Sequence, residues 1–161
     1  MAENKDAVKN TDTATATNNN VKKAEKAPKV KSERELKAEK LKKLLENRTD
    51  FEAKLIKAIS RGSFGLVDKS LLSKDKEVIF TTMRIIGELR VDKYVDPIAQ
   101  VVCDAADPAF RKTAAESLGL MKNTRALFQL IKRMEIEKDP AVLAAIKDAV
   151  RAIHNKEAEA E

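Results

Sequence analysis

The chain has 161 residues, of which 43% are hydrophobic and only 4% aromatic, and its formal net charge is +6. One cysteine excludes a disulfide framework, and one histidine leaves too few ligands for a multi-histidine metal centre. Four glycines and four prolines are too few for the tight turns of a β-sandwich. With no apolar run long enough to span a membrane and no signal-peptide pattern, we expect a cytoplasmic all-α protein without a cofactor.

The first 31 residues differ in composition from the rest of the chain. TDTATATNNN at residues 11–20 is low in complexity, and a lysine-rich stretch follows it. Neither stretch can bury enough apolar surface to offset the entropy lost on ordering, so we predict a disordered basic arm over residues 1–31. Residues 1–48 contain 13 basic and 8 acidic residues, whereas residues 49–161 contain 19 and 18. The positive charge is therefore concentrated before residue 49.

Two capping boxes follow the arm. Ser32 with Glu35 predicts the start of a connector helix over residues 32–48, which either docks on the next helix or lies on a membrane or RNA surface. Thr49 with Glu52 predicts a second helix that ends at Gly62. A short helix is expected to follow and to reach Ser73.

A repeat begins after this short helix. Asp75, Asp107 and Asp139 are spaced by 32 residues, and apolar positions such as Ile86, Leu118 and Val150 coincide at the same offset. The predicted domain spans residues 49–154. It divides into a degenerate unit at 49–74, units at 75–106 and 107–138, and a half repeat at 139–154. An acidic tail at 155–161 follows the domain.

Each repeat unit predicts a helical hairpin. The aspartate caps the first helix, and proline follows it in two of the three copies. Asp92 and Thr124 are expected to cap the second helices. One hairpin cannot bury its apolar faces alone, and stacking on the next hairpin can do so, which predicts a solenoid.

The second unit resembles a HEAT repeat of the short bacterial type, also called phycobilisome-lyase HEAT-like. The residues that fit this pattern are Asp107, Pro108, Arg111, Ala114, Ala115, Leu118, Gly119, Ala126, Leu127 and Leu130. The first unit departs from the pattern at Lys76, Ile79 and Thr82, and the last has only its first helix. Tetratricopeptide repeats are the rival architecture, but they require aromatic residues that this chain lacks. The resemblance implies a short right-handed α-solenoid.

No arrangement of residues indicates catalysis, so we expect a protein that is not an enzyme. Cys103 is predicted to be a small core residue and His154 to lie at the end of the last helix. RGSFG lacks the ending of a phosphate-binding loop. Some short HEAT-like proteins act as bilin lyases or chaperones, which leaves that role as a third interpretation.

Ten basic residues between positions 21 and 43 form the main charged feature. The same stretch contains only four glutamates. The basic residues are Lys22, Lys23, Lys26, Lys29, Lys31, Arg34, Lys37, Lys40, Lys42 and Lys43. Such a segment can bind RNA, DNA or the ribosome through phosphate contacts. The alternative is a tether or protein-docking arm.

The resemblance also implies that the second helices line the concave, partner-binding side. The residues expected to point away from the core there are Gln100, Asp104, Gln129, Lys132 and Arg133. The leading functional prediction is therefore a non-catalytic adaptor or scaffold that binds another protein. The accessory nucleic-acid or ribosome binder is the alternative.

Overall fold

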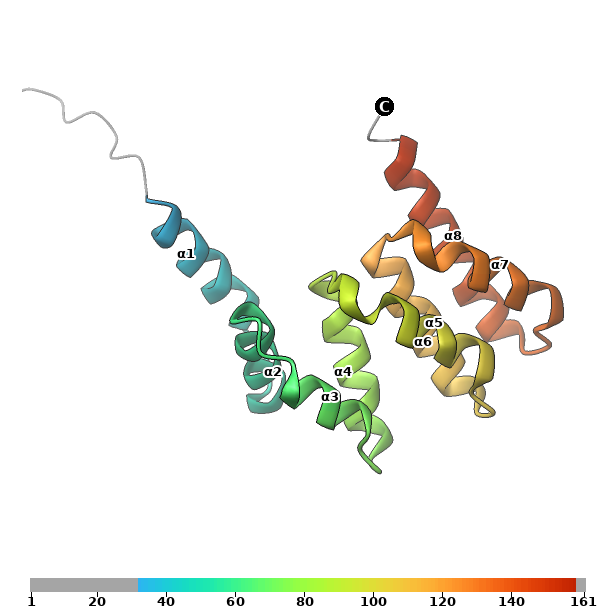
Figure 1. Ribbon diagram of the computed structural model, residues 1–161, viewed down its shortest axis with the longest axis horizontal. Helices are drawn as coiled ribbons and strands as arrows, with labels where there is room; N and C mark the ends of the chain where they lie inside the picture. Colours follow the sequence, from blue (N-terminus) through green and yellow to red (C-terminus); the bar gives the residue numbers. More distant parts are fainter. Residues whose placement is uncertain (1–31, 159–161) are drawn as a thin grey trace, which may run out of the picture.

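The computed structural model describes residues 32–158, which form eight α-helices and two short 3-10 helices, with no strand in this range (Figure 1). The predicted disorder of residues 1–31 lies outside the described residues. The α-helices are α1 (Glu33–Leu45), α2 (Asp50–Ser60), α3 (Gly65–Leu71), α4 (Lys76–Glu88), α5 (Val95–Asp104), α6 (Pro108–Met121), α7 (Leu127–Ile136) and α8 (Pro140–Ala158), and the 3-10 helices are η1 (Asp92–Tyr94) and η2 (Thr124–Ala126). None of the helices in this range is long and apolar enough to cross a membrane.

The predicted starts of α1 and α2 are confirmed. The Ser32 hydroxyl accepts a hydrogen bond from the Glu35 backbone N–H, and the Glu35 carboxylate accepts one from the Ser32 N–H. Thr49 and Glu52 make the same reciprocal pair. Helix α2 is followed by Gly62, whose φ of 72° is the left-handed conformation that glycine adopts at low cost.

Aspartate caps the first helix of each repeat unit, as predicted. Asp75, Asp107 and Asp139 each accept a hydrogen bond from the backbone N–H two residues later, over 2.9 Å in every case. Three such caps explain why these helices begin at equivalent positions of the 32-residue repeat.

The predicted caps of the second helices are wrong. A 3-10 helix precedes α5 and another precedes α7, and neither Asp92 nor Thr124 is an N-cap. Before α7 the Asn123 side chain accepts a hydrogen bond from the Arg125 backbone N–H over 3.0 Å. Asp92 instead accepts a hydrogen bond from Asn123 Nδ2 over 2.9 Å, so this aspartate links successive units.

The helices form two layers. Helices α4, α6 and α8 lie side by side in chain order, and α5 and α7 lie along one side of them (Figure 1). Helix α5 packs closely on α6, and α7 packs on α8. These antiparallel pairs cross the boundaries of the 32-residue units, because each second helix contacts the first helix of the following unit.

Two glycines allow the first helices to approach one another. A Cβ atom on Gly87 would lie 2.8 Å from the Ser117 carbonyl oxygen, and one on Gly119 would lie 3.0 Å from the Ala149 Cα atom. The first distance is shorter than real Cβ atoms show, and the second is tighter than most real Cβ contacts. The repeated glycine is therefore a packing requirement of the layer formed by α4, α6 and α8.

The core lies between the two layers and extends to α2. Its largest fully buried side chains include Leu55, Ile56, Met83, Ile85, Ile86, Ile98, Leu118, Met121, Leu130, Ile146 and Ile153. Leu118 and Ile86 are fully buried, as the repeat register predicts, and Val150 is half-buried. Helix α1 extends away from the rest of the molecule and contributes no buried residue (Figure 1).

Helix α8 is longer than the sequence analysis predicts. It continues to Ala158, so residues 155–158, which we assign to the acidic tail, are helical. His154 consequently lies within the helix rather than at its end. The last three residues of the predicted tail lie outside the described range.

Candidate functional site

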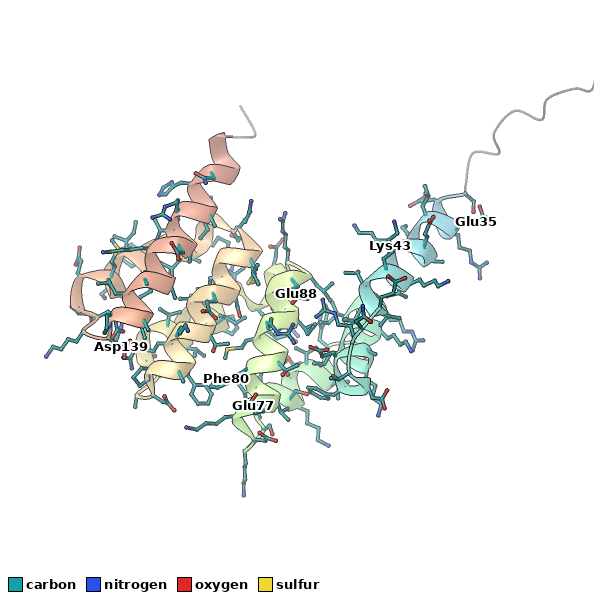
Figure 2. The ribbon with its side chains drawn as sticks, turned by 180° about the vertical axis from the view of Figure 1, so that it is seen from behind. Glu35, Lys43, Glu77, Phe80, Glu88 and Asp139 are labelled. Atoms are coloured by element: carbon teal, nitrogen blue, oxygen red, sulfur yellow. The ribbon has the colours of Figure 1, made fainter. Side chains whose placement is uncertain are left out.

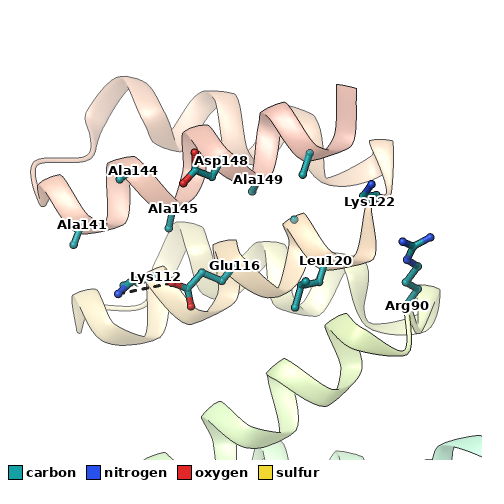
Figure 3. Close-up of a pocket in the computed structure, with 12 residues that line it drawn as sticks. Arg90, Lys112, Glu116, Leu120, Lys122, Ala141, Ala144, Ala145, Asp148 and Ala149 are labelled. Atoms are coloured by element: carbon teal, nitrogen blue, oxygen red, sulfur yellow. Dashed lines mark ion pairs between the residues drawn. The ribbon is translucent and has the colours of Figure 1, made fainter. Parts of the chain in front are cut away.

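A groove with a volume of about 670 Å³ runs between α6 and α8 (Figure 3). Its apolar lining consists of Gly119 and Leu120 from α6 and of Ala141, Ala144, Ala145, Ala149 and Ala152 from α8. Gly119 brings the backbones of α6 and α8 close together along the groove. Leu120 is 45% exposed beside these alanines, so the apolar surface of the groove continues onto α6. The groove therefore offers an apolar floor to a partner.

Charged side chains surround this floor. Lys112 and Glu116 form an ion pair on α6 with Nζ and Oε1 3.7 Å apart. Asp148 forms another with Arg151, over 3.1 Å. Arg90 lies at the end of the groove that is also lined by Lys122 (Figure 3). Mixed charges line most of the groove, and this one end is basic.

Two of these residues occupy special backbone positions. Arg90 has φ of 51° and Lys122 has φ of 50°, the left-handed conformation that non-glycine residues seldom adopt. They follow the ends of α4 and α6 respectively. The left-handed residue ends each helix and directs a basic side chain toward the same end of the groove (Figure 3).

A second hollow of about 390 Å³ lies between α4 and α6. It is lined from α4 by Glu77, Phe80, Thr81 and Arg84, and it shares Glu116 and Leu120 with the groove between α6 and α8. Figure 2 shows this face of the molecule, with Glu77 and Phe80 on α4. We call the combined surface over α4, α6 and α8 the first-helix face.

The predicted protein-binding residues lie in the other layer. Gln100, Asp104 and Lys132 are exposed on α5 and α7, and Gln100 Nε2 donates to Asp104 Oδ2 over 2.9 Å. Gln129 and Arg133 do not point freely into solvent, contrary to the prediction. The Gln129 Oε1 atom is buried, and the Arg133 guanidinium is held in a polar network.

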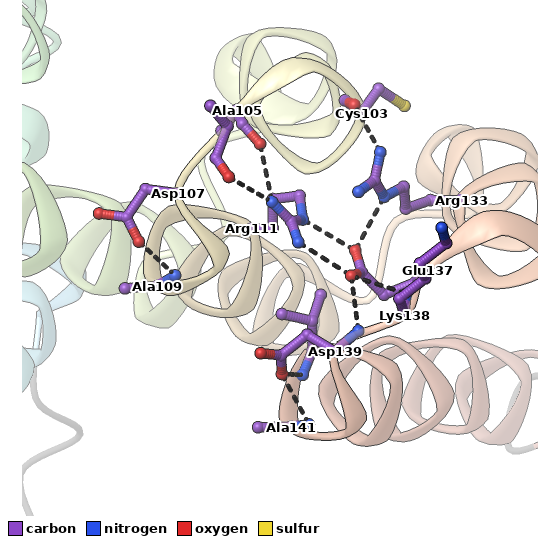
Figure 4. Close-up of polar contacts among 12 residues, drawn as sticks. Cys103, Ala105, Asp107, Ala109, Arg111, Arg133, Glu137, Lys138, Asp139 and Ala141 are labelled. Carbon is purple, nitrogen blue, oxygen red and sulfur yellow. Dashed lines mark hydrogen bonds and ion pairs between the residues drawn. The ribbon is translucent and has the colours of Figure 1, made fainter.

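That network connects two units through a buried carboxylate. Glu137 accepts hydrogen bonds from the Arg111 guanidinium over 2.8 and 2.9 Å and from Arg133 Nε over 2.9 Å (Figure 4). Arg111 also donates to the carbonyls of Ala105 and Ala106, and Arg133 donates to that of Cys103. Hydrogen bonds from Arg111, with further bonds from the Asp139 N–H and Arg133, lower the pKa of Glu137 to about 2. This geometry gives Arg133 and Arg111 a structural role.

The single cysteine is poorly suited to nucleophilic chemistry. Burial raises the pKa of the Cys103 thiol, and the neighbouring Asp104 carboxylate raises it further. The thiol form is therefore favoured, whereas a reactive cysteine needs the thiolate. Within residues 32–158, no cluster of histidine, cysteine and carboxylate side chains is arranged to hold a metal ion.

Half of the predicted polyanion-binding residues fall in the described range. Arg34, Lys37, Lys40, Lys42 and Lys43 are exposed on α1, and Lys37 Nζ pairs with Glu33 Oε1 over 2.6 Å. Lys22, Lys23, Lys26, Lys29 and Lys31 lie outside it. The structure therefore places five cations on a helix that extends from the body (Figure 1).

The first-helix face was not predicted from the sequence. Neither the alanines of α8 nor Leu120 was assigned to a surface from the sequence. The sequence contains one indication of this face, which is the helical position of Leu120. It is offset from the positions of the buried residues Leu118 and Met121.

Stacked antiparallel helices and successive units related by a 32-residue repeat define an α-solenoid. A family model described as HEAT repeats matches residues 66–151, more than half of the chain, and the protein belongs to this family. HEAT repeats generally mediate protein–protein interactions. Comparison with curated proteins gives no match.

Proposed function

We propose that the protein is a non-catalytic adaptor that binds an amphipathic helix of another protein in the groove between α6 and α8. The observation that carries the proposal is the groove itself, with its floor of alanines, the half-exposed Leu120 and a charged margin. Helices that bind in grooves place apolar anchors on the floor and charged residues at the margin.

The charge distribution supports one orientation of the bound helix. Arg90 and Lys122 line the same end of the groove. A helix carries partial negative charge at its C-terminus, so that end is favoured next to basic side chains. The partner helix is therefore expected to have small apolar residues on one face and its C-terminal end, or acidic residues, near Arg90.

Site-specific photo-crosslinking in the source cell tests this proposal. A photoreactive side chain at Ala144 should form an adduct with a defined partner, whereas the same side chain at Gln100, on the opposite layer, should not. Adding Leu120→Asp to the Ala144 probe should remove the adduct, and Gln100→Asp is the matched control. Equal adducts at both probe positions, or none at Ala144, would contradict the proposal.

Nucleic-acid or ribosome binding through residues 21–43 is the second candidate. It is supported by the five exposed cations on α1 and by the near balance of charge in residues 49–161. Filter binding to RNA should weaken steeply with salt, and deleting residues 21–43 should remove most of the affinity. Undiminished RNA binding by the deleted form would contradict this assignment and place the binding surface on the solenoid.

The remaining predictions are narrower. The short repeat, its two Asp-Pro starts and the Leu118–Gly119 pair support a bacterial protein of the phycobilisome-lyase type. A cytoplasmic location is a separate prediction. A bilin-handling role would require co-purification of a pigment with the natively expressed protein, visible in its absorbance spectrum. An unpigmented protein that still forms the groove adduct favours the adaptor over the bilin role.

A further inference from the structure

Helix α7 exposes an apolar surface on the side of the molecule away from the first-helix face. Phe128 is 72% exposed, Ile131 40% and Ile136 63%. Lys132 and Glu135 are also exposed on the same outward side of the helix. We call these five residues the α7 patch. An isolated exposed apolar residue is ordinary, but three on one ten-residue helix indicate a contact surface.

Comparison with the preceding unit explains why the patch is uncovered. Ala99 on α5 stands at the repeat position of Ile131 and is only 1% exposed in the packed stack. Asp96 stands at the position of Phe128 and forms an ion pair with Arg125, which precedes α7. In the described part of the chain no second-layer helix follows α7. Gln100 and Asp104, at the positions of Lys132 and Ile136, stay exposed within the stack. The edge of the α7 patch at Ile131 is thus the side on which a second-layer helix would pack.

The first layer does not continue in the same way. Helix α8 has Lys147 and Arg151 where α6 has Ala115 and Gly119. Gly119 permits contact between helix backbones, and an arginine at that position keeps a further first-layer helix away. The occupant of the α7 patch therefore covers α7 without adding a whole repeat.

The charged residues of the α7 patch can pair with those of the same patch on a second copy of the chain. Lys132 and Glu135 have opposite sign, lie three residues apart and form no ion pair within residues 32–158. Across a two-fold axis, two antiparallel α7 helices can place each Lys132 opposite the other copy's Glu135. Such an interface uses the same patch on both partners, as two-fold dimers do.

We propose that the occupant is a second copy of this chain, which forms a two-fold dimer through antiparallel α7 helices. Phe128, Ile131 and Ile136 supply the apolar contact, and Lys132 pairs with Glu135 across it. One short helix buries less than the roughly 800 Å² per partner of a standard interface, so the dimer is weak and depends on protein concentration. Because α7 lies on the layer opposite the groove, both grooves stay open (Figures 1 and 2).

Sedimentation of the full chain over a range of concentrations tests the proposal. The unaltered protein should shift reversibly from monomer to dimer. Lys132→Glu and Glu135→Lys should each weaken the dimer at least about tenfold, because like charges then meet twice across the axis. Gln100→Glu, at the repeat position of Lys132 on α5, is the matched control and should leave the dimer unchanged.

Mixing the two single variants separates loss of charge pairing from loss of folding. At a concentration where each alone is monomeric, the Lys132→Glu and Glu135→Lys chains should form a heterodimer, since every facing pair is then of opposite sign. The chain with both substitutions should dimerise like the unaltered protein. A full chain that stays monomeric at high concentration, as it would if the N-terminal arm or another protein covered α7, overturns the proposal. So does a dimer that none of these substitutions changes.

Discussion

The Glu137 carboxylate, at the end of the second unit, holds the two arginines that donate hydrogen bonds to backbone carbonyls of the first unit. Its side chain is 1% exposed and that of Arg111 is 9% exposed, so each buried charge relies on the other. Glu137→Gln should lower the free energy of unfolding by about 3 kcal/mol, because removing one partner leaves a buried guanidinium without its counter-charge. Urea unfolding at neutral pH measures this loss.

Acid unfolding provides an independent check on the same residue. The pKa of Glu137 falls from an ordinary 4.5 to about 2 on folding, so its contribution is complete above pH 4.5 and is lost as the pH falls toward 2. The stability difference between the unaltered protein and Glu137→Gln should therefore shrink across that range. Glu116→Gln, at an exposed ion pair, should change stability by less than about 0.5 kcal/mol at any pH. A difference that is constant with pH would contradict the assignment.

Glycine substitutions test the close approach of the first helices. Gly87→Ala should destabilise the protein, because the added methyl meets the Ser117 backbone at 2.8 Å. Overpacking of this kind costs about 1–3 kcal/mol, against a gain of up to about 1 kcal/mol in helix propensity. Gly65→Ala is the control, since nothing lies within 4 Å of its Cβ position. Thermal unfolding in which both variants behave alike would show that the layer can widen at no cost.

At the scale of the helix, the caps are the features that the sequence predicts best. A cap involves residues two or three positions apart, so Ser32, Thr49 and the repeat aspartates could be identified from local spacing alone. The 3-10 helices before α5 and α7 were missed, and Asp92, the expected cap of α5, instead accepts a hydrogen bond from Asn123 of the next unit. A local pattern does not reveal a side chain whose partner is 31 residues away.

The contribution of the N-cap of α8 to the stability of the protein can be measured. Asp139 Oδ1 accepts hydrogen bonds from the backbone N–H groups of Ala141 and Val142 over 2.9 and 3.0 Å. Asp139→Ala should lower the free energy of unfolding by about 1 kcal/mol, the usual cost of losing an N-cap. Asp139→Asn keeps an acceptor oxygen and should cost clearly less. Equal losses in urea unfolding would mean that the charge, rather than the cap, stabilises the helix.

At the scale of the whole molecule, the periodicity predicts the stack but not where its surface is hollowed. Apolar positions at a 32-residue spacing identify buried residues such as Leu118 without any structure. The hollows on the first-helix face lie beside the Gly87–Ser117 and Gly119–Ala149 contacts between neighbouring units. The expected binding surface on α5 and α7 was inferred from family resemblance, whereas the groove follows from these particular small residues.

The position of α6 has a consequence for the order in which backbone amides exchange with solvent. Helix α6 contacts α4, α5 and α8, whereas α1 has no buried residue and packs only weakly on α2. A stack of this kind opens from its least supported end, so local openings should release α1 far more often than α6. Hydrogen–deuterium exchange should therefore label α1 within the shortest times, α2 and α3 later, and the amides around Leu118 last. Early labelling of α6 would mean that the stack opens from its centre.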